Sequence, residues 1–261
     1  MKRNPSYYDA DRIFLRNLAA RDIAEPLLSF DDTTPGETAR ETLLEARLAV
    51  AGVRRKGRVC GFLLADELGA GTCAEVIHPL EEAVVINGSA ALLEVLRAIK
   101  DAPWVLVRSL GEVSGVVTRA DLQDPPVRMW LFGMITVIEL RFQTMIEEHF
   151  EVEDWSQYIS PARLGKAVEM RAERQRRNEN PTLVECLQFS DKAQIIARNE
   201  TLREKAGFIS RRRADEVAKR LQTLRNNLAH SQEIVETDWE VITGLADNLQ
   251  RLFDLGYFGT H

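Results

Sequence analysis

The stretch Gly115-Val116-Val117-Thr118-Arg119-Ala120-Asp121 indicates the fold of the first half of the chain. A short apolar run, typical of a strand, leads here into a turn at which a helix is expected to begin. Thr118 and the N–H groups of a helix start can bind a phosphate, and Asp121 can accept hydrogen bonds from ribose hydroxyls. Because Thr and Asp also cap helices without any ligand, the stretch predicts either a nucleotide site or a plain cap.

Short helical runs alternate with short apolar or β-branched runs around this stretch. Strands are expected at Arg58–Leu64, Ala83–Ile86, Trp104–Val107 and Val113–Thr118, with turns at residues 55–57 and 109–111. Helices are expected at Arg12–Phe30 and, with Ser89 as N-cap, at Ala90–Lys100, whose apolar face is Leu92, Val95, Leu96 and Ile99. This alternation predicts a mixed α/β fold for residues 1–124.

The quoted stretch resembles the ligand-binding signature of CBS domains, Gly-x-x-Thr/Ser-x-x-Asp. CBS domains occur as pairs, and the resemblance places the first copy from about Ile13 to Ala70. The equivalent stretch of that copy, residues 61–67, lacks the hydroxyl and carries Glu67 where the aspartate belongs. The resemblance covers about 120 residues, and it implies that the first ligand site is altered or lost.

This resemblance also implies the class of ligand. An adenosine-containing molecule is expected, namely AMP, ADP, ATP, S-adenosylmethionine or a signalling dinucleotide. Thr118 and Asp121 would hold it, and His78, at the start of the second copy, is a candidate for lining the same pocket. An ordinary loop position for His78 is the alternative.

The pattern changes at Asp124-Pro125-Pro126, after which strand signals vanish. Helices are expected at Val127–Phe150, at Pro161–Arg177 with Ser160 as N-cap, and at Trp239–Leu255 with a capping box of Thr237 and Glu240. Ser190 and Ser210 are expected to cap two further helices. Residues 125–261 are therefore predicted to form an all-α bundle, which makes the chain α+β in class.

The helical half carries the sequence Arg225-Asn226-Asn227-Leu228-Ala229-His230. Residues five apart on a regular helix lie about 140° from each other, so Arg225 and His230 do not share a face, whereas Asn226 and His230 do. Arg225 and His230 converge only if the helix ends there or if two copies of the motif meet. A helix end at which His230 interacts with the last carbonyls is the structural alternative.

This motif and its all-α setting resemble the R-x4-6-H motif of HEPN domains, many of which are metal-independent endoribonucleases that act as dimers. The resemblance implies that Arg225 stabilises charge on the scissile phosphate, that His230 moves a proton, and that Asn226 orients the phosphate or the other two residues. It implies RNA rather than DNA as the substrate, no metal or other cofactor for catalysis, and products with 2′,3′-cyclic phosphate ends.

Composition excludes several other classes of protein. A net charge of −6 rules out a uniformly basic nucleic-acid binder, although residues 161–225 carry 16 Lys or Arg against 9 Asp or Glu. The apolar run Trp130–Leu140 is too short to span a membrane, and no signal peptide is evident. The three cysteines form no paired motif. These features predict a cytoplasmic protein without structural disulfides or a zinc site.

The two resemblances together imply a nucleotide-regulated ribonuclease of the kind found in toxin and antiviral defence systems. Residues 1–124 would sense an adenine nucleotide, and two copies of residues 125–261 would form one RNase site in a homodimer. The apolar helix expected at Val127–Phe150 would form part of the dimer core. The alternative function is a non-catalytic regulatory protein, in which the helical half serves dimerisation or partner docking.

Overall fold

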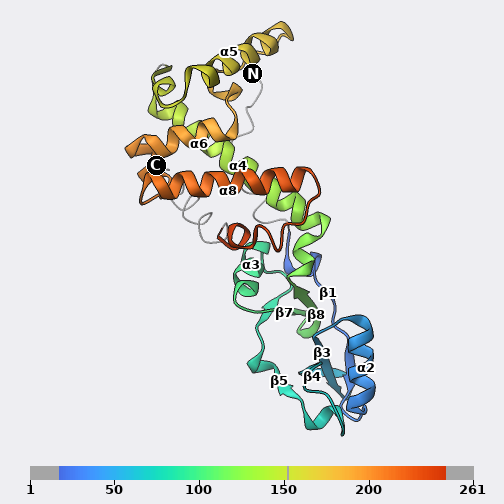
Figure 1. Ribbon diagram of the computed structural model, residues 1–261. Coiled ribbons are helices and arrows are strands. Elements are labelled where there is room, and N and C mark those ends of the chain that lie inside the picture. Colours follow the sequence, from blue (N-terminus) through green and yellow to red (C-terminus); the bar gives the residue numbers. More distant parts are fainter. Residues whose placement is uncertain (1–17, 152, 245–261) are drawn as a thin grey trace. The chain divides into compact units, whose positions relative to one another are not determined.

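In a computed structural model of the protein, residues 18–151 and 153–244 are described. The described residues divide into two compact units, residues 18–127 and residues 128–244 (Figure 1). The first unit contains strands and helices, and the described residues of the second contain helices alone. The mixed α/β fold expected for the first half of the chain is thus confirmed.

Two four-stranded sheets make up the first unit. The first sheet has the order β2 (Ser29–Asp31), β3 (Val50–Arg55), β4 (Arg58–Leu64), β5 (His78–Pro79). The second sheet has the order β6 (Val85–Asn87), β7 (Trp104–Ser109), β8 (Glu112–Thr118), β1 (Glu25–Pro26). In each sheet the first pair is parallel and the other two pairs are antiparallel.

The two sheets are an internal duplication of one pattern: short strand, helix, hairpin. Helix α2 (Gly36–Ala46) lies between β2 and β3 in the chain, and α3 (Leu92–Lys100) lies between β6 and β7. β7 begins 54 residues after β3, and β8 begins 54 residues after β4. The register irregularity of each hairpin recurs at the same offset, after Val53 and after Val107. Residues of the two repeats can therefore be compared position by position.

Each hairpin closes through a two-residue turn in which both residues have positive φ. These values are 53° and 79° for Lys56 and Gly57, and 51° and 85° for Leu110 and Gly111. Positive φ at both central positions characterises the type I′ turn, whose twist matches that of the flanking strands. Glycine at the second position allows this backbone without a steric penalty.

Apolar residues on both faces of the sheets form the core of the first unit. Side chains from α2, β3 and β4 pack together in the first repeat, and Figure 1 shows α2 beside these strands: Ala39, Leu43, Ala51, Val53 and Leu63. The opposite face of the sheet packs on the second repeat: Val50, Phe62, Leu106, Val113 and Val116. Because both faces are covered, β3 is a nearly continuous apolar run rather than an alternating one.

Two predictions for this unit were wrong. Arg12–Phe30 is not a helix over its described part, because residues 18–30 form the 3₁₀ turn η1 (Ala20–Asp22) and the short strands β1 and β2. Residues 12–17 lie outside the described part. Ser89 does not cap α3, since its hydroxyl donates to Asn87 Oδ1 over 2.8 Å and Ala91 is the N-cap. The sequence analysis also missed α2 and β3.

Helices form the described part of the second unit. They are α4 (Pro125–His149), η5 (Glu153–Tyr158), α5 (Pro161–Arg176), η6 (Val184–Cys186), α6 (Phe189–Arg198), α7 (Glu200–Lys205) and α8 (Arg211–Ala229). Residues 239–244 begin a further helix, and the rest of the predicted helix Trp239–Leu255 lies outside the described residues. The buried face of α8 contains Leu221, Leu224 and Leu228, and α8 packs against α6.

Two of the predicted N-caps form and two do not. The Ser160 and Ser210 hydroxyls accept hydrogen bonds from the backbone N–H groups of Arg163 and Arg213, over 3.4 and 3.2 Å. Ser190 lies inside α6, whose first turn is instead capped by the Asp191 carboxylate. No hydrogen bond joins the described residues Thr237 and Glu240, so the predicted capping box is not formed; the Thr237 hydroxyl donates to the Glu233 carbonyl over 2.9 Å.

Helix α4 is longer than the apolar run that it contains. With 25 residues it is, by length and composition alone, the one described helix that could cross a membrane. In its most apolar window 56% is buried inside the protein, as in core helices, which pass the same test. The apolar run Trp130–Leu140 lies inside this helix, and the burial of the helix matches that of a core helix.

Candidate functional site

The signature of the second repeat forms a tight turn at the end of β8. Asp121 Oδ2 accepts hydrogen bonds from the Thr118 backbone N–H over 2.6 Å and from the Thr118 hydroxyl over 3.0 Å. Asp121 is 6% exposed and lies in the 3₁₀ turn η4 (Ala120–Gln123). The structure thus brings together the two residues predicted from the signature, and in this state they cap the turn.

Burial raises the pKa of the Asp121 carboxyl above its ordinary value. The two hydrogen bonds from Thr118 oppose this shift because they stabilise the charged form, while the nearby carboxylates of Glu25 and Asp124 add to it. A phosphate group bound at this turn must therefore stay clear of Glu25 and Asp124. A hydroxyl group, by contrast, can donate directly to the desolvated carboxylate.

A neighbouring strand approaches the glycine of each signature closely. Gly61 pairs with Pro79 of β5, and Gly115 pairs with Pro26 of β1. A Cβ atom at Gly61 would lie 2.4 Å from the backbone oxygen of His78, which is closer than any real contact. The glycines thus let the two-residue strands lie against β4 and β8.

The first repeat carries a different set of groups at the equivalent positions. Leu64 replaces Thr118, and Glu67 replaces Asp121, each at the 54-residue offset. Glu67 Oε2 lies 2.5 Å from His78 Nε2, while Glu82 Oε2 lies 3.3 Å from His78 Nδ1. The hydrogen bond to Glu67 is the main cause that raises the pKa of His78. Thus His78 lies in β5 of the first sheet and bonds to Glu67, whereas Thr118 and Asp121 bond to each other.

The motif residues of the helical unit lie at the end of α8. Arg225, Asn226 and His230 are exposed, and their side chains form no hydrogen bond or ion pair with any described residue. The helix ends at Ala229, so His230 is its C-cap and has left the helical conformation with φ −102°. The helix end named above as one condition for convergence is therefore present, but no hydrogen bond joins the Arg225 and His230 side chains.

A tight turn fixes the backbone that follows the motif. Ser231 has φ 53°, and the N–H of Gln232 donates to the Asn227 carbonyl over 2.9 Å. This is the hydrogen-bond pattern of a Schellman motif, which satisfies the last carbonyls of a helix. The Asn227 side chain also donates to Asp238 Oδ2 over 2.7 Å. The turn that carries His230 is thus fixed by a backbone hydrogen bond and by a side-chain hydrogen bond.

Arg128 of α4 is a functional candidate that the sequence analysis missed. Its guanidinium donates to the backbone carbonyls of Gln232, Asn227 and Leu228 over 2.8, 3.1 and 3.3 Å. No sequence pattern could reveal this contact, since about a hundred residues separate the partners.

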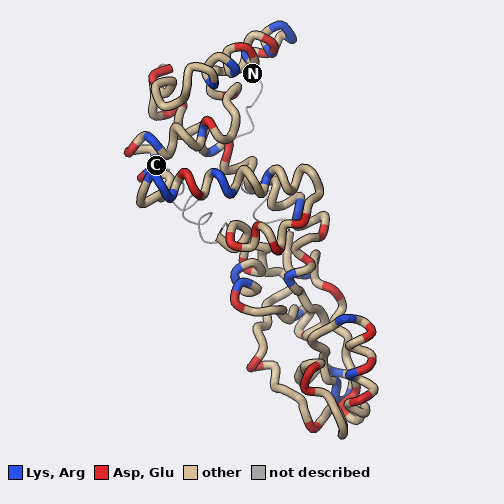
Figure 2. The backbone as a smooth tube through the Cα atoms, viewed as in Figure 1, with Lys and Arg blue, Asp and Glu red and all other residues tan. Residues whose placement is uncertain are grey.

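Several basic side chains of residues 161–225 form ion pairs, most of them with acidic residues of the same segment. Pairs join Arg163 to Asp191, Arg174 to Glu179, Arg177 to Glu173, Arg211 to Asp215 and Arg220 to Glu240. Figure 2 shows basic and acidic segments interspersed along α5 and α8. This distribution matches a solvated helix surface with mixed charges more closely than a continuous phosphate-binding surface.

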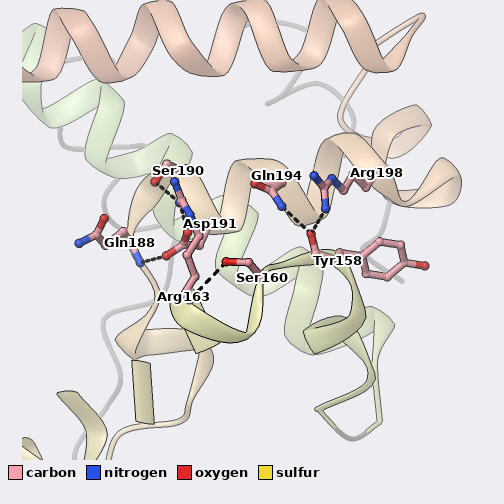
Figure 3. A network of polar contacts seen from close by, with 8 residues as sticks. All are labelled: Tyr158, Ser160, Arg163, Gln188, Ser190, Asp191, Gln194 and Arg198. Atoms are coloured by element: carbon pink, nitrogen blue, oxygen red, sulfur yellow. Dashed lines mark hydrogen bonds and ion pairs between the residues drawn. The ribbon is translucent and has the colours of Figure 1, made fainter. Parts of the chain in front are cut away.

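A groove of about 760 Å³ lies between α5 and the segment from η6 to α6. Figure 3 shows the polar network beside it, in which Arg163 bonds to Ser190 and to Asp191, while Gln194 and Arg198 donate to the Tyr158 carbonyl. The groove is lined by side chains of both charges, among them the pairs Arg163–Asp191 and Arg176–Glu173, so it does not define a binding site of one sign. Within residues 18–151 and 153–244, no group of three or more His, Cys, Asp or Glu could hold a metal ion.

The comparisons with known proteins concern the first unit. No family model matches the sequence, and no curated protein matches it. Solved structures similar to the chain include proteins described as containing CBS domains. They include a CBS domain-containing protein from Bacillus anthracis str. Ames Ancestor, which is 13% identical with a TM-score of 0.37 and coverage of 42% of this chain and 94% of that one.

Two further similar structures contain a nucleotide according to their descriptions. CBSX2, described from Arabidopsis thaliana, in complex with AMP is 15% identical, with a TM-score of 0.37 and coverage of 43% of this chain and 98% of that one. The CBS domain of a bacterial CNNM/CorC family Mg²⁺ transporter in complex with ATP is 19% identical, with a TM-score of 0.34 and coverage of 44% and 91%. At these TM-scores the likeness assigns neither ligand nor activity to this chain.

Proposed function

We propose that this protein is regulated by an adenine nucleotide that binds at Thr118 and Asp121 of a CBS-type pair. The observation that carries the proposal is the buried Asp121 carboxylate, held by the N–H and hydroxyl of Thr118 at the end of a strand. AMP and ATP, which are bound to two similar proteins, are the first ligands to test.

The geometry suits a nucleoside phosphate in the following way. A ribose hydroxyl donates to Asp121, whose carboxylate has little water to lose because it is already buried. The Thr118 hydroxyl can rotate away from Asp121 and donate to a phosphate oxygen instead. The first repeat offers no equivalent, since Leu64 has no hydroxyl and Glu67 is bonded to His78. One nucleotide per chain is therefore expected.

Calorimetric titration of AMP and ATP tests this proposal. Asp121→Asn and Thr118→Val should each weaken binding at least tenfold, because each removes one group that holds the ligand. Asp124→Asn, an exposed carboxylate next to the same turn, is the matched control and should retain binding. Equal affinity of wild type and Asp121→Asn, or two nucleotides per chain, would contradict the assignment.

A second proposal concerns the helical unit, which we assign to metal-independent RNA cleavage by a homodimer. The observation that favours it is that the side chains of Arg225, Asn226 and His230 are exposed and form no hydrogen bond or ion pair with any described residue. The backbone turn that follows them is held by hydrogen bonds. Exposed groups with nothing to bind in their own chain are available to a substrate or to a second copy. In this proposal the motifs of two copies line one cleft, so the site requires a dimer.

RNA supplies the nucleophile and the leaving group of this reaction, and these residues supply the proton transfers and the charge stabilisation. The 2′-oxygen attacks the adjacent phosphorus, and its proton passes to a neutral His230 imidazole. The 5′-oxygen of the next nucleotide leaves and takes a proton from the protonated imidazole of the other copy. Arg225 stabilises the charge on the phosphate oxygens, and Asn226 orients them. The products are a 2′,3′-cyclic phosphate and a 5′-hydroxyl.

The exposed face of α4 supports a second copy as the partner. Met129, Phe132 and Leu140 are 72%, 39% and 39% exposed. They form one stripe with Thr136, whose hydroxyl is turned back to the Phe132 carbonyl over 3.0 Å. Phe132 and Leu140 lie four residues on either side of Thr136, so antiparallel packing of two α4 helices would place each Phe132 against the Leu140 of the other copy.

Cleavage of a mixed RNA pool in the presence of EDTA tests the second proposal. His230→Ala and Arg225→Ala should each lower the rate at least a hundredfold, while Arg212→Ala, an exposed arginine of the same helix, should not. Absence of cleavage by folded, dimeric protein with AMP, with ATP and without nucleotide would instead favour the role of a partner-docking module.

A further inference from the structure

Arg128 lies in the first turn of α4 and binds the end of α8. Its Nη1 donates to the Gln232 carbonyl over 2.8 Å, and its Nη2 donates to the carbonyls of Asn227 and Leu228 over 3.1 and 3.3 Å. Asn227 and Leu228 belong to the motif stretch itself, and Gln232 follows it by two residues. One side chain therefore bonds to the backbone on both sides of His230.

Arginine is suited to this position for two reasons. The last carbonyls of a helix lack intrahelical partners and carry partial negative charge, which a cation stabilises. The guanidinium also holds several N–H donors in a rigid planar fork, so it can bond to three carbonyls at once. The compact ammonium group of a lysine cannot span the same acceptors.

Arg128 is also close in the chain to the turn proposed to bind nucleotide. Asp121 lies seven residues before Arg128, and only the rest of η4 and the first turn of α4 separate them. The 3₁₀ turn is closed by the Asp121 carboxylate, which bonds to Thr118. The turn proposed to bind nucleotide therefore lies directly before the helix that carries Arg128.

We propose that Arg128 is a positioning residue, which holds the turn carrying His230 and relays nucleotide binding at Thr118 and Asp121 to that turn. The relay rests on the proposed functions of both sites, whereas the positioning role does not. The relay requires that the turn carrying His230 has two arrangements, and that the protein binds nucleotide with a different affinity in each of them. By linkage, RNA must then change the affinity for nucleotide by the same factor.

Amide hydrogen exchange tests the positioning role without RNA or nucleotide. In Arg128→Lys, exchange at Ser231 and Gln232 should accelerate at least tenfold relative to wild type, since the carbonyls that close the turn lose their common donor. Arg212→Lys is the matched control and should leave these amides unchanged. Unchanged exchange in Arg128→Lys, with the protein folded, would overturn the role.

The relay is tested by the imidazole NMR signal of His230, identified by its loss in His230→Ala. Adding AMP to wild type should shift this signal, whereas in Arg128→Lys the shift should disappear while AMP still binds. The AMP-dependent change in RNA cleavage, expected to be about fivefold or more, should fall below twofold in the same variant. An AMP-induced shift of equal size in Arg128→Lys, or none in wild type that binds AMP, would overturn the relay.

The outcomes separate the relay from the functions on which it rests. If wild type does not bind AMP or ATP, the nucleotide assignment fails and the relay fails with it, while the exchange measurement still decides the positioning role. If AMP binds and shifts His230 but RNA is not cleaved, the ribonuclease assignment alone fails.

Discussion

The carboxylates at the equivalent positions of the two repeats differ because of their neighbours. Asp121 is buried and bonds to Thr118 of its own turn. Glu67 is half-exposed and bonds to His78, which is supplied by the next strand of the sheet. The carboxylate at this position therefore accepts hydrogen bonds from a neutral residue in the second repeat, whereas in the first repeat it pairs with a histidine.

The pair formed by His78 and Glu67 should make stability depend on pH. The pKa of His78 is raised above 6.5, so its contribution is fully present below pH 6.5 and is lost as the pH rises through the raised value. The difference in melting temperature between wild type and His78→Gln should therefore be larger at about pH 6 than at about pH 8. Glu67→Gln should show the same trend, and a pH-independent difference would contradict it.

Lys192 forms a buried ion pair that joins two helices of the second unit. Lys192 is 3% exposed, and its Nζ lies 3.1 Å from Glu139 Oε1. Lys192→Met should lower the free energy of unfolding by about 2–3 kcal/mol, below the ~3–5 kcal/mol of a fully buried pair because Glu139 is partly exposed. Urea denaturation measures this loss, and the double variant Lys192→Met/Glu139→Leu should recover most of it. A loss in the double variant equal to that in the single one would contradict this explanation.

At the scale of elements, the two hairpins show which sequence positions define the repeat. Lys56-Gly57 and Leu110-Gly111 share only the glycine, yet both turns have the same backbone conformation. The side chain at the first position is free to vary because it points to solvent, as the fully exposed Leu110 shows.

Glycine to alanine substitutions should therefore lower the free energy of unfolding in the hairpin turns and raise it inside a helix. Gly57→Ala and Gly111→Ala should each lower the free energy of unfolding by about 1 kcal/mol, since alanine is strained at positive φ. Gly165→Ala, at an exposed position inside α5, should raise it by about 0.5–1 kcal/mol, because alanine favours the helix. Denaturation midpoints measure all three, and destabilisation by Gly165→Ala would contradict this explanation.

At the scale of the whole molecule, the stripe on α4 should decide the oligomeric state. Phe132→Glu and Leu140→Glu should each convert a dimer to a monomer in sedimentation velocity, because each buries a carboxylate against an apolar partner. Val168→Glu, at an exposed apolar position on α5, is the control and should leave the dimer intact.

A disulfide test locates the axis of that dimer. In a variant without the exposed Cys60, Thr136→Cys should form a crosslinked dimer on oxidation, because the two copies of residue 136 meet at the axis. Dimers that resist both glutamate substitutions and do not crosslink would place the interface elsewhere.

The sequence predicted elements whose signals are local. The strand Arg58–Leu64, the buried face of α3, and the caps Ser160 and Ser210 were predicted because a strand pattern, a helical period or a capping residue marks each one. The helix predicted over Arg12–Phe30 was wrong because β1 and β2 are two and three residues long and form only by pairing with distant strands.

The candidate sites divide in the same way. Thr118 and Asp121 are three residues apart in one turn, so the sequence alone could bring them together. His78 was expected in the same pocket, but tertiary structure pairs it with Glu67. The contacts of Arg128 at the end of α8 could not be predicted either, because its acceptors are backbone carbonyls, which every residue has.

By itself, the sequence determined the class of the fold, its duplication and the turn at Thr118–Asp121, since hydrophobic period, glycine placement and short-range capping act within a few residues. Only the tertiary structure decided that Glu67 is bonded to His78, that Lys192 pairs with Glu139, and that Arg128 holds the turn that follows the α8 motif. These contacts join residues that are distant in the chain, and the fold alone supplies their distances and their burial.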